Sequence, residues 1–174
     1  MKLSKEEKKF WQRHFRIDTL ENIPTEMVGL TSIDTTDDDE YLFYLTQRVK
    51  VIPEIYLKGT LVTDEGVAHL SKIQELKELT LRDHKKVTKA SIPYFNQMKN
   101  LERLNITLTK ITLSDLCESL NNQSLKEVFL SSEENEKNIE EKAFIIKERL
   151  LNCNIYLDCC YTTDSFGNIE KPIF

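Results

Sequence analysis

Glycine is scarce in this sequence, with four residues among 174. Loops that cradle phosphate groups depend on closely spaced glycines, so a phosphate-binding loop of that kind is not expected. The motifs GxSxG and HExxH, which mark nucleophilic serines and zinc-binding helices, are missing as well. The three histidines, His14, His69 and His84, lie far apart in the chain. We therefore predict a protein that is not an enzyme and binds no cofactor, with an enzyme of unrecognised site as the alternative.

Long apolar runs are also missing. The opening residues, MKLSKEEKKFWQRHF, are mostly charged and polar and lack the apolar core of a signal peptide. No stretch approaches the roughly 18 apolar residues that a membrane-spanning helix requires. A chain that opens on methionine without a leader is typical of the cytoplasm, so we predict a cytoplasmic protein that does not contact a membrane.

Cysteine is too sparse for a disulfide framework. Cys117, Cys153, Cys159 and Cys160 occur in a chain without the features of a small secreted domain. Cys153 with the adjacent pair Cys159 and Cys160 is an alternative metal site, but a second ligand pair with CxxC-type spacing is lacking. We expect reduced, structural cysteines and no metal.

Basic residues do not exceed acidic ones. The chain has 24 Lys and Arg against 29 Asp and Glu, a net charge of -5, which argues against nucleic acid as a partner. A mildly acidic protein more naturally meets a basic partner. Because 40% of residues are apolar and 30% charged, we expect a folded chain that forms a single domain over residues 1–174.

A short pattern recurs along the chain. LKELTL (76–81), LERLNI (101–106) and LKEVFL (125–130) each have apolar residues at their first, fourth and sixth places. Aligning six units on the last apolar place gives Leu30, Leu57, Leu81, Ile106, Leu130 and Leu157. The regular spacing of these six residues indicates stacked units that share one continuous core, because no single unit can bury its own apolar face.

Each unit combines a strand with a helix. In LTL and LNI the apolar residues are two apart, so both point to the same side of a strand. A threonine then follows a turn, at Thr63, Thr88 and Thr112, where its hydroxyl can cap a helix. In the second of these units Pro93 lies too deep for a helix that starts at Thr88, so Ser91 is the expected cap.

These motifs resemble the leucine-rich repeat family, in the form of a short bacterial-type protein. The resemblance is most specific over residues 52–130. It departs from the family at Thr60, His84, Thr109 and Glu133, where the family often has Asn or Cys. The resemblance implies an α/β solenoid, with parallel strands on a concave face and short helices on the convex face. It also implies that the protein serves protein recognition.

The two ends depart from the repeat. Ser4 to Glu7 has the form of a capping box and predicts a helix to about Phe15, part of a helical N-terminal cap over residues 1–24. About five to six repeats follow over 25–160, and 161–174 forms a C-terminal cap or tail. Further helices are expected at 37–47 and 138–151. The acidic start of the first, TDDDE, suits a helix dipole better than calcium, because the later ligands of a calcium loop are missing.

The repeat also predicts a binding surface. The residue between the two inward apolar side chains projects from the concave sheet, and its neighbours two places away flank it. The first row is Gly29, Tyr56, Thr80, Asn105, Phe129 and Tyr156; the flanking rows begin at Met27 and at Thr31. Aromatic and arginine side chains are the usual anchors of protein interfaces. The predicted partner-binding residues are Tyr56, Arg82, Arg103, Asn105, Glu127, Phe129 and Tyr156.

Two alternatives concern this surface. The C-terminal tail can cover one or two of the aromatic side chains, and Glu78, Arg103 and Glu127 can form cross-strand ion pairs without a partner.

The sequence thus favours a protein-binding module, and the sharper hypothesis is an immunity protein that neutralises a basic toxin. A regulatory adaptor or a substrate-recognition subunit is the runner-up, and a purely structural role is a third possibility.

Overall fold

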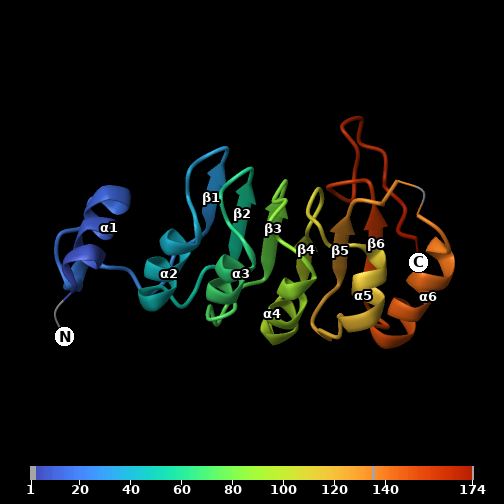
Figure 1. The fold of residues 1–174 in the computed structure, drawn as a ribbon, viewed down its shortest axis with the longest axis horizontal. Coiled ribbons are helices and arrows are strands. Elements are labelled where there is room, and N and C mark those ends of the chain that lie inside the picture. The colour runs from blue at the N-terminus through green and yellow to red at the C-terminus, as the bar shows by residue number, and fades with distance from the viewer. Residues whose placement is uncertain (1–2, 135, 174) are drawn as a thin grey trace.

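The computed structural model describes residues 3–134 and 136–173, and within them the fold is α/β. A six-stranded parallel sheet has its strands in chain order (Figure 1). The strands are β1 (Leu30–Ile33), β2 (Glu54–Lys58), β3 (Glu78–Arg82), β4 (Arg103–Asn105), β5 (Glu127–Leu130) and β6 (Asn154–Leu157).

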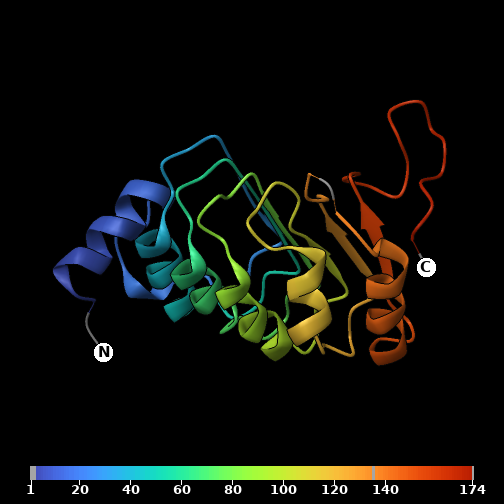
Figure 2. The same cartoon turned by 45° about the vertical axis from the view of Figure 1, so that its right-hand side comes forward.

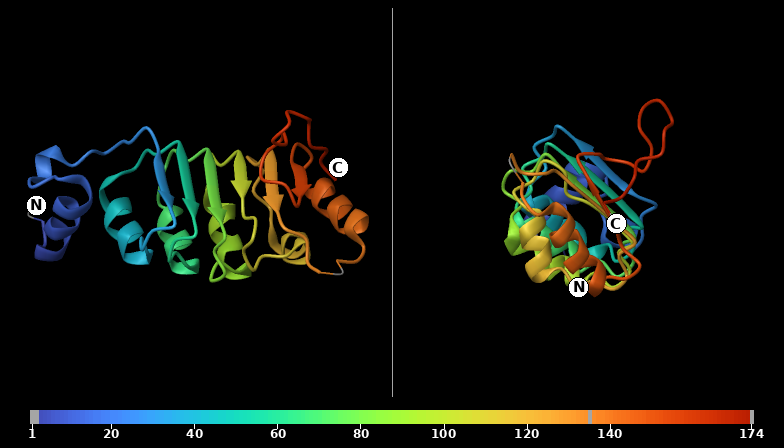
Figure 3. Two further views of the ribbon diagram at one scale, coloured as in Figure 1. Left: turned by 90° about the horizontal axis from the view of Figure 1, so that it is seen from above. Right: turned by 90° about the vertical axis from the view of Figure 1, so that its right-hand side faces the viewer.

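The described residues contain six α-helices and two short 3-10 helices. They are α1 (Lys5–Phe15), η1 (Leu20–Asn22), α2 (Asp39–Arg48), α3 (Asp64–Leu70), η2 (Lys89–Ser91), α4 (Ile92–Gln97), α5 (Leu113–Ser119) and α6 (Ile139–Arg149). Helices α2 to α6 lie along one face of the sheet, and α1 lies beyond α2 at the N-terminal end (Figure 3). Among the described residues, no helix has the length and apolar character needed to cross a membrane.

The core fills the space between the sheet and these helices. The inward residues of the strands are almost fully buried, as at Leu79, Leu81 and Leu104. Their alternation with outward residues leaves a second sheet face without helices, which we call the helix-free face. The pattern of two apolar residues two apart therefore predicted the inner side of the middle strands correctly.

The expected register of the first unit is wrong by two residues. Leu30 pairs with Ile55, so Ser32 and not Leu30 stands beside Leu57. Ser32 is buried at this inward place because its Oγ donates to Asp37 over 2.5 Å and bonds Thr35 over 2.7 Å. Because a polar residue occupies a place where the pattern expects an apolar one, the pattern misaligned this strand. Thr31 and not Gly29 therefore belongs to the predicted row of outward residues.

The recurring threonines cap helices, and a carboxylate from the preceding unit holds two of them. Thr63 Oγ1 accepts from Glu65 N over 3.2 Å, while Asp39 accepts from Thr63 N and Oγ1 over 2.8 and 2.6 Å. Asp64 binds Thr88 in the same way, over 2.8 and 2.7 Å. Successive units are thus joined by hydrogen bonds as well as by apolar contacts.

The helices expected at the ends are present with small changes of bounds. Helix α2 begins at Asp39, two residues later than expected, with Asp38 as its cap. In the third unit Ser91 precedes α4 as expected but caps nothing, because its hydroxyl donates to Asp64 instead. In α1 the Ser4 hydroxyl accepts from Glu7 N, yet the Glu7 carboxylate does not return to Ser4 and binds Arg48.

The turns after five of the strands use a left-handed residue. The five have φ between 53° and 60° and are Asp34, Gly59, Asp83, Leu108 and Asp158. Glycine, aspartate and asparagine adopt this conformation readily, whereas a branched apolar residue does so at a cost of roughly 1–2 kcal/mol. Leu108 is therefore the strained member of the set.

Replacing Leu108 with asparagine is expected to raise the free energy of unfolding by about 0.5–1 kcal/mol, because asparagine tolerates the left-handed region. Urea denaturation followed by circular dichroism measures the change. Leu61→Asn is the matched control, since Leu61 is also an exposed turn leucine but has no positive φ. An equal shift in both variants would show that Leu108 is not strained.

Candidate functional site

The helix-free face brings the seven predicted binding residues onto one surface. Tyr56 and Arg82 come from β2 and β3, and the others come from β4 to β6. The strand register places Arg103 beside Glu127, Asn105 beside Phe129, and Phe129 beside Tyr156. The expectation that Phe129 and Tyr156 are neighbours on adjacent strands is confirmed.

Arg103 forms an ion-pair network with its strand neighbours. Its Nη1 lies 3.0 Å from Glu78 Oε2, and its Nε lies 2.6 Å from Glu127 Oε2. The arginine side chain is 44% exposed, so the network contributes little to stability and is accessible from solvent. The cross-strand ion pairs are thus present, and they fix the direction in which Arg103 points.

The expected exposure of Phe129, Tyr156 and Asn105 is wrong. Their exposed fractions are 0%, 5% and 4%. The two rings stack with centroids 4.7 Å apart, and the segment that follows β6 lies over this end of the face. Asn105 Nδ2 donates to the carbonyl of Cys160 over 3.0 Å. The C-terminal tail therefore covers these residues, because aromatic rings on a sheet face favour removal from water.

The part of the helix-free face over β1 to β3 remains accessible, and we call it the open half. Ile33 is 48% exposed, and Tyr56, Lys58 and Arg82 are half-buried. Tyr161 reaches this region from the tail, and the neighbouring Tyr56 hydroxyl, together with burial, raises the pKa of Tyr161. Arg82 Nε is buried and has no hydrogen-bond partner among the described residues.

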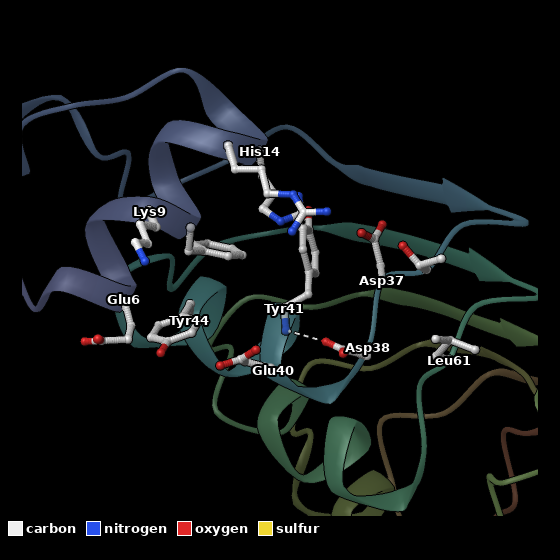
Figure 4. A pocket seen from close by; sticks show the side chains of 12 residues that line it. Glu6, Lys9, His14, Asp37, Asp38, Glu40, Tyr41, Tyr44 and Leu61 are labelled. Carbon is white, nitrogen blue, oxygen red and sulfur yellow. Dashed lines mark hydrogen bonds between the residues drawn. The ribbon is translucent and has the colours of Figure 1, made fainter.

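A second hollow lies between α1 and α2 and was not predicted. It has a volume of about 530 Å³ and is lined on one side by α1 and on the other by α2 and the loop before it (Figure 4). The acidic loop residues already have structural partners, since Asp38 accepts from Tyr41 N over 3.0 Å and Asp37 accepts from Ser32 Oγ. The capping box at Ser4 to Glu7 predicted a helical cap in this region, but nothing in the sequence predicted the hollow.

The part of the chain that the structure describes contains no cluster of possible metal ligands. Within residues 3–134 and 136–173, no group of three or more His, Cys, Asp and Glu side chains is placed to hold an ion. Cys153 is buried, and burial raises the pKa of its thiol to about 12. A thiol with so high a pKa is an unreactive core side chain at neutral pH.

His84 occupies a place where the family resemblance leads one to look for an asparagine. It is 2% exposed, and its Nε2 lies 2.7 Å from Thr60 Oγ1 of the preceding unit. Its Nδ1 has no partner among the described residues. Burial lowers the pKa of His84 below the ordinary value of 6.5.

The unfolding free energy is therefore expected to fall between about pH 7.5 and about pH 5.5, because His84 binds a proton more readily in the unfolded chain. The stability that comes from keeping His84 neutral is fully present above the pKa of this histidine in the unfolded chain. It is lost as the pH falls below that value. His84→Asn keeps a partner for Thr60 and should reduce the fall, as measured by urea denaturation at both pH values. An unchanged pH dependence in this variant would contradict the assignment to His84.

The three histidines lie in three separate environments. His14 lines the α1–α2 hollow, His69 lies on α3 near Lys72, and His84 is buried beside Thr60. The helix-free face is the surface on which aromatic, cationic and anionic side chains from several strands converge. A scan against protein-family models and a search of curated proteins found no match to the chain.

Proposed function

We propose that this chain is a protein-binding module of the leucine-rich-repeat type, which holds a partner protein against the helix-free face. The regular return of the strand motif, the parallel sheet in chain order and the helices on one face support this assignment. On this proposal the helix-free face is the concave side of a solenoid. Such a surface presents side chains from many strands to one ligand.

The Nε of Arg82, which has no hydrogen-bond partner among the described residues, is the observation that carries the proposal. This buried donor lies at an otherwise accessible sheet surface, and buried donors without partners are uncommon in folded proteins. Tyr56 lies on the neighbouring strand, and the paired residue of Arg82 is Lys58. An acceptor group of a partner would complete the hydrogen bonding of Arg82, while Tyr56 would supply apolar contact.

The charges of this face indicate a partner with both signs of charge. Glu54, Glu78 and Glu127 lie on the face with Lys58, Arg82 and Arg103. A surface meant to block a basic toxin would be expected to be predominantly acidic. The proposal is therefore a protein partner in general, and the charge pattern does not favour the narrower immunity-protein hypothesis.

Affinity capture from the producing cells tests the proposal with a matched pair of double variants. Tyr56→Ala/Arg82→Ala removes two side chains of the open half, and Phe43→Ala/Lys89→Ala removes an aromatic and a cation from the helix side. We expect at least about tenfold weaker retention of the partner by the first variant only, which corresponds to about 1.4 kcal/mol. Equal retention by both would contradict binding at the open half.

A further inference from the structure

The C-terminal segment 159–173, which we call the strap, lies on the helix-free face but is joined to it by few contacts. The Cys160 carbonyl accepts from Asn105 Nδ2 over 3.0 Å, and its Sγ lies 3.8 Å from Thr107 Oγ1. Near its end, Ile173 N donates to Ile155 O over 2.8 Å. Between these points the strap projects away from the sheet as a loop (Figure 2).

The projecting part is organised by its own hydrogen bonds. Asp164 accepts from Phe166 N and Asn168 N, each over 2.8 Å, and thereby closes the loop on itself. Phe166 and Ile169 are 88% and 81% exposed, and Tyr161 is 58% exposed. Little apolar area of the projecting part is therefore buried, so the strap is held at its two ends, near Cys160 and at Ile173, which packs against the core.

The surface beneath the strap has the features of a peptide groove. Asn105 Oδ1 accepts from Thr107 N and Oγ1, over 3.1 and 2.8 Å, so its Nδ2 is fixed as a donor toward whatever lies above. Beside it the stacked Phe129 and Tyr156 offer an apolar floor outside the main core. A hollow of about 400 Å³ remains between Arg103, Phe129 and strap residues 160–165.

Resting on the proposed function, we propose that the face over β4 to β6 binds an extended peptide segment of the partner, and that the strap is an intramolecular occupant that this segment displaces. The strap itself indicates the chemistry of the ligand. A backbone carbonyl accepts from Asn105 Nδ2, as that of Cys160 does, and an aromatic residue follows it in the chain, as Tyr161 does. A ligand segment thus has a small residue followed by an aromatic one.

A tethered occupant competes at a high effective concentration, of millimolar order for a short linker. A separate peptide is therefore expected to bind wild-type protein weakly and to bind better once the strap is loosened. Tyr161→Ala/Ile173→Ala loosens the strap at its two ends. Phe166→Ala/Ile169→Ala is the matched control, because it removes two apolar side chains of the same segment that are 88% and 81% exposed.

The probe is a fluorescein-labelled synthetic peptide of residues 159–173, and its fluorescence anisotropy is titrated against each full-length protein under reducing conditions. We expect a Kd at least about tenfold lower for the loosened variant than for the control variant, the fold-change that corresponds to about 1.4 kcal/mol. Adding Asn105→Ala to the loosened variant is expected to raise the Kd again by at least about tenfold.

Equal peptide affinity of the loosened and control variants would overturn the groove, as would binding that is insensitive to Asn105→Ala. Tyr161→Ala alone provides a second loosened protein, because this side chain is largely exposed and its loss leaves the core intact. Circular dichroism checks the fold of each variant. Failure here leaves the proposed function standing, since capture through Tyr56 and Arg82 of the open half is measured separately.

Discussion

Replacing Arg48 with alanine is expected to lower the free energy of unfolding by about 3 kcal/mol. Arg48 Nε and Nη2 donate to the two carboxylate oxygens of Glu7 over 2.6 and 3.0 Å. The Glu7 side chain is only 7% exposed, and its hydrogen bond with Arg48 lowers its pKa. Removing the arginine leaves a carboxylate in the contact between α1 and α2 without its counterion, which is costly because the charge cannot be fully hydrated.

The measurement is urea denaturation followed by tryptophan fluorescence. Trp11 is the only tryptophan, lies on α1 and is fully buried, so its emission reports on the attachment of this helix. Arg13→Ala, an exposed arginine on the same helix, is expected to change the unfolding free energy by less than about 0.5 kcal/mol. A similar small effect for Arg48→Ala would contradict the structural role of the ion pair.

A second variant separates the unpaired charge from the loss of packing. Glu7→Leu/Arg48→Met replaces both charges by apolar side chains of similar length. Because such replacements of a buried pair are often neutral, this double variant is expected to recover most of the stability lost in Arg48→Ala. A double variant as unstable as the single one would show that the cost arises from packing and not from the charge.

Replacing Asn122 with alanine is expected to lower the free energy of unfolding by about 3 kcal/mol. Asn122 is 5% exposed, and its Nδ2 donates to Phe95 O and Met98 O over 2.7 and 2.8 Å. Its Oδ1 accepts from Ser124 N over 3.0 Å. Alanine removes both donations, so Phe95 O and Met98 O lose this donor and keep their backbone donors, Met98 N and Leu101 N. It also leaves Ser124 N, in the loop that joins α5 to β5, without its acceptor in the interior.

Asn121 supplies the control for this prediction. It is the preceding residue and is exposed, so Asn121→Ala is expected to change the unfolding free energy by less than about 0.5 kcal/mol. Thermal and urea denaturation followed by circular dichroism compare the two variants. Equal stability of the two would show that the buried amide at position 122 is not needed to satisfy the loop.

The strands and helices of this protein could largely be predicted from its sequence, because local period and capping determine them. Leu79 and Leu81 are two apart and buried, and the threonines at 63 and 112 cap helices as their position indicates. The first strand was misaligned because Ser32 is buried through side-chain hydrogen bonds, and its polarity gives no apolar signal.

The candidate site was predictable only in part. The alternation of inward and outward residues placed Tyr56 and Phe129 on one face, but it carried no information on what covers that face. The tail that buries Phe129 has no regular period, and its contact with Asn105 joins residues 55 positions apart. The partner of Glu7 is likewise 41 residues away, so the capping motif alone suggested a local bond that the structure does not contain.

The open half and the strap give the face two regions with different properties. Over β1 to β3 it presents Tyr56, Lys58 and Arg82 without helices above them, whereas over β4 to β6 it is occupied. A partner that contacts Ile33 and Lys58 would bind without moving the strap, whereas one that covers Tyr56 would meet Tyr161. A partner that spans both regions would need to displace the strap, and its association would then be slowed by that opening step.

Site-specific photo-crosslinking in the producing cells tests binding at the helix-free face most directly. The photoreactive phenylalanine analogue p-benzoylphenylalanine replaces Tyr56 on this face in one protein and Phe43 on helix α2 in another, so an aromatic residue is exchanged in both. We expect one discrete crosslinked product of higher mass from position 56 and none from position 43. A product from position 43 alone, or from neither position, would contradict a partner bound at the helix-free face.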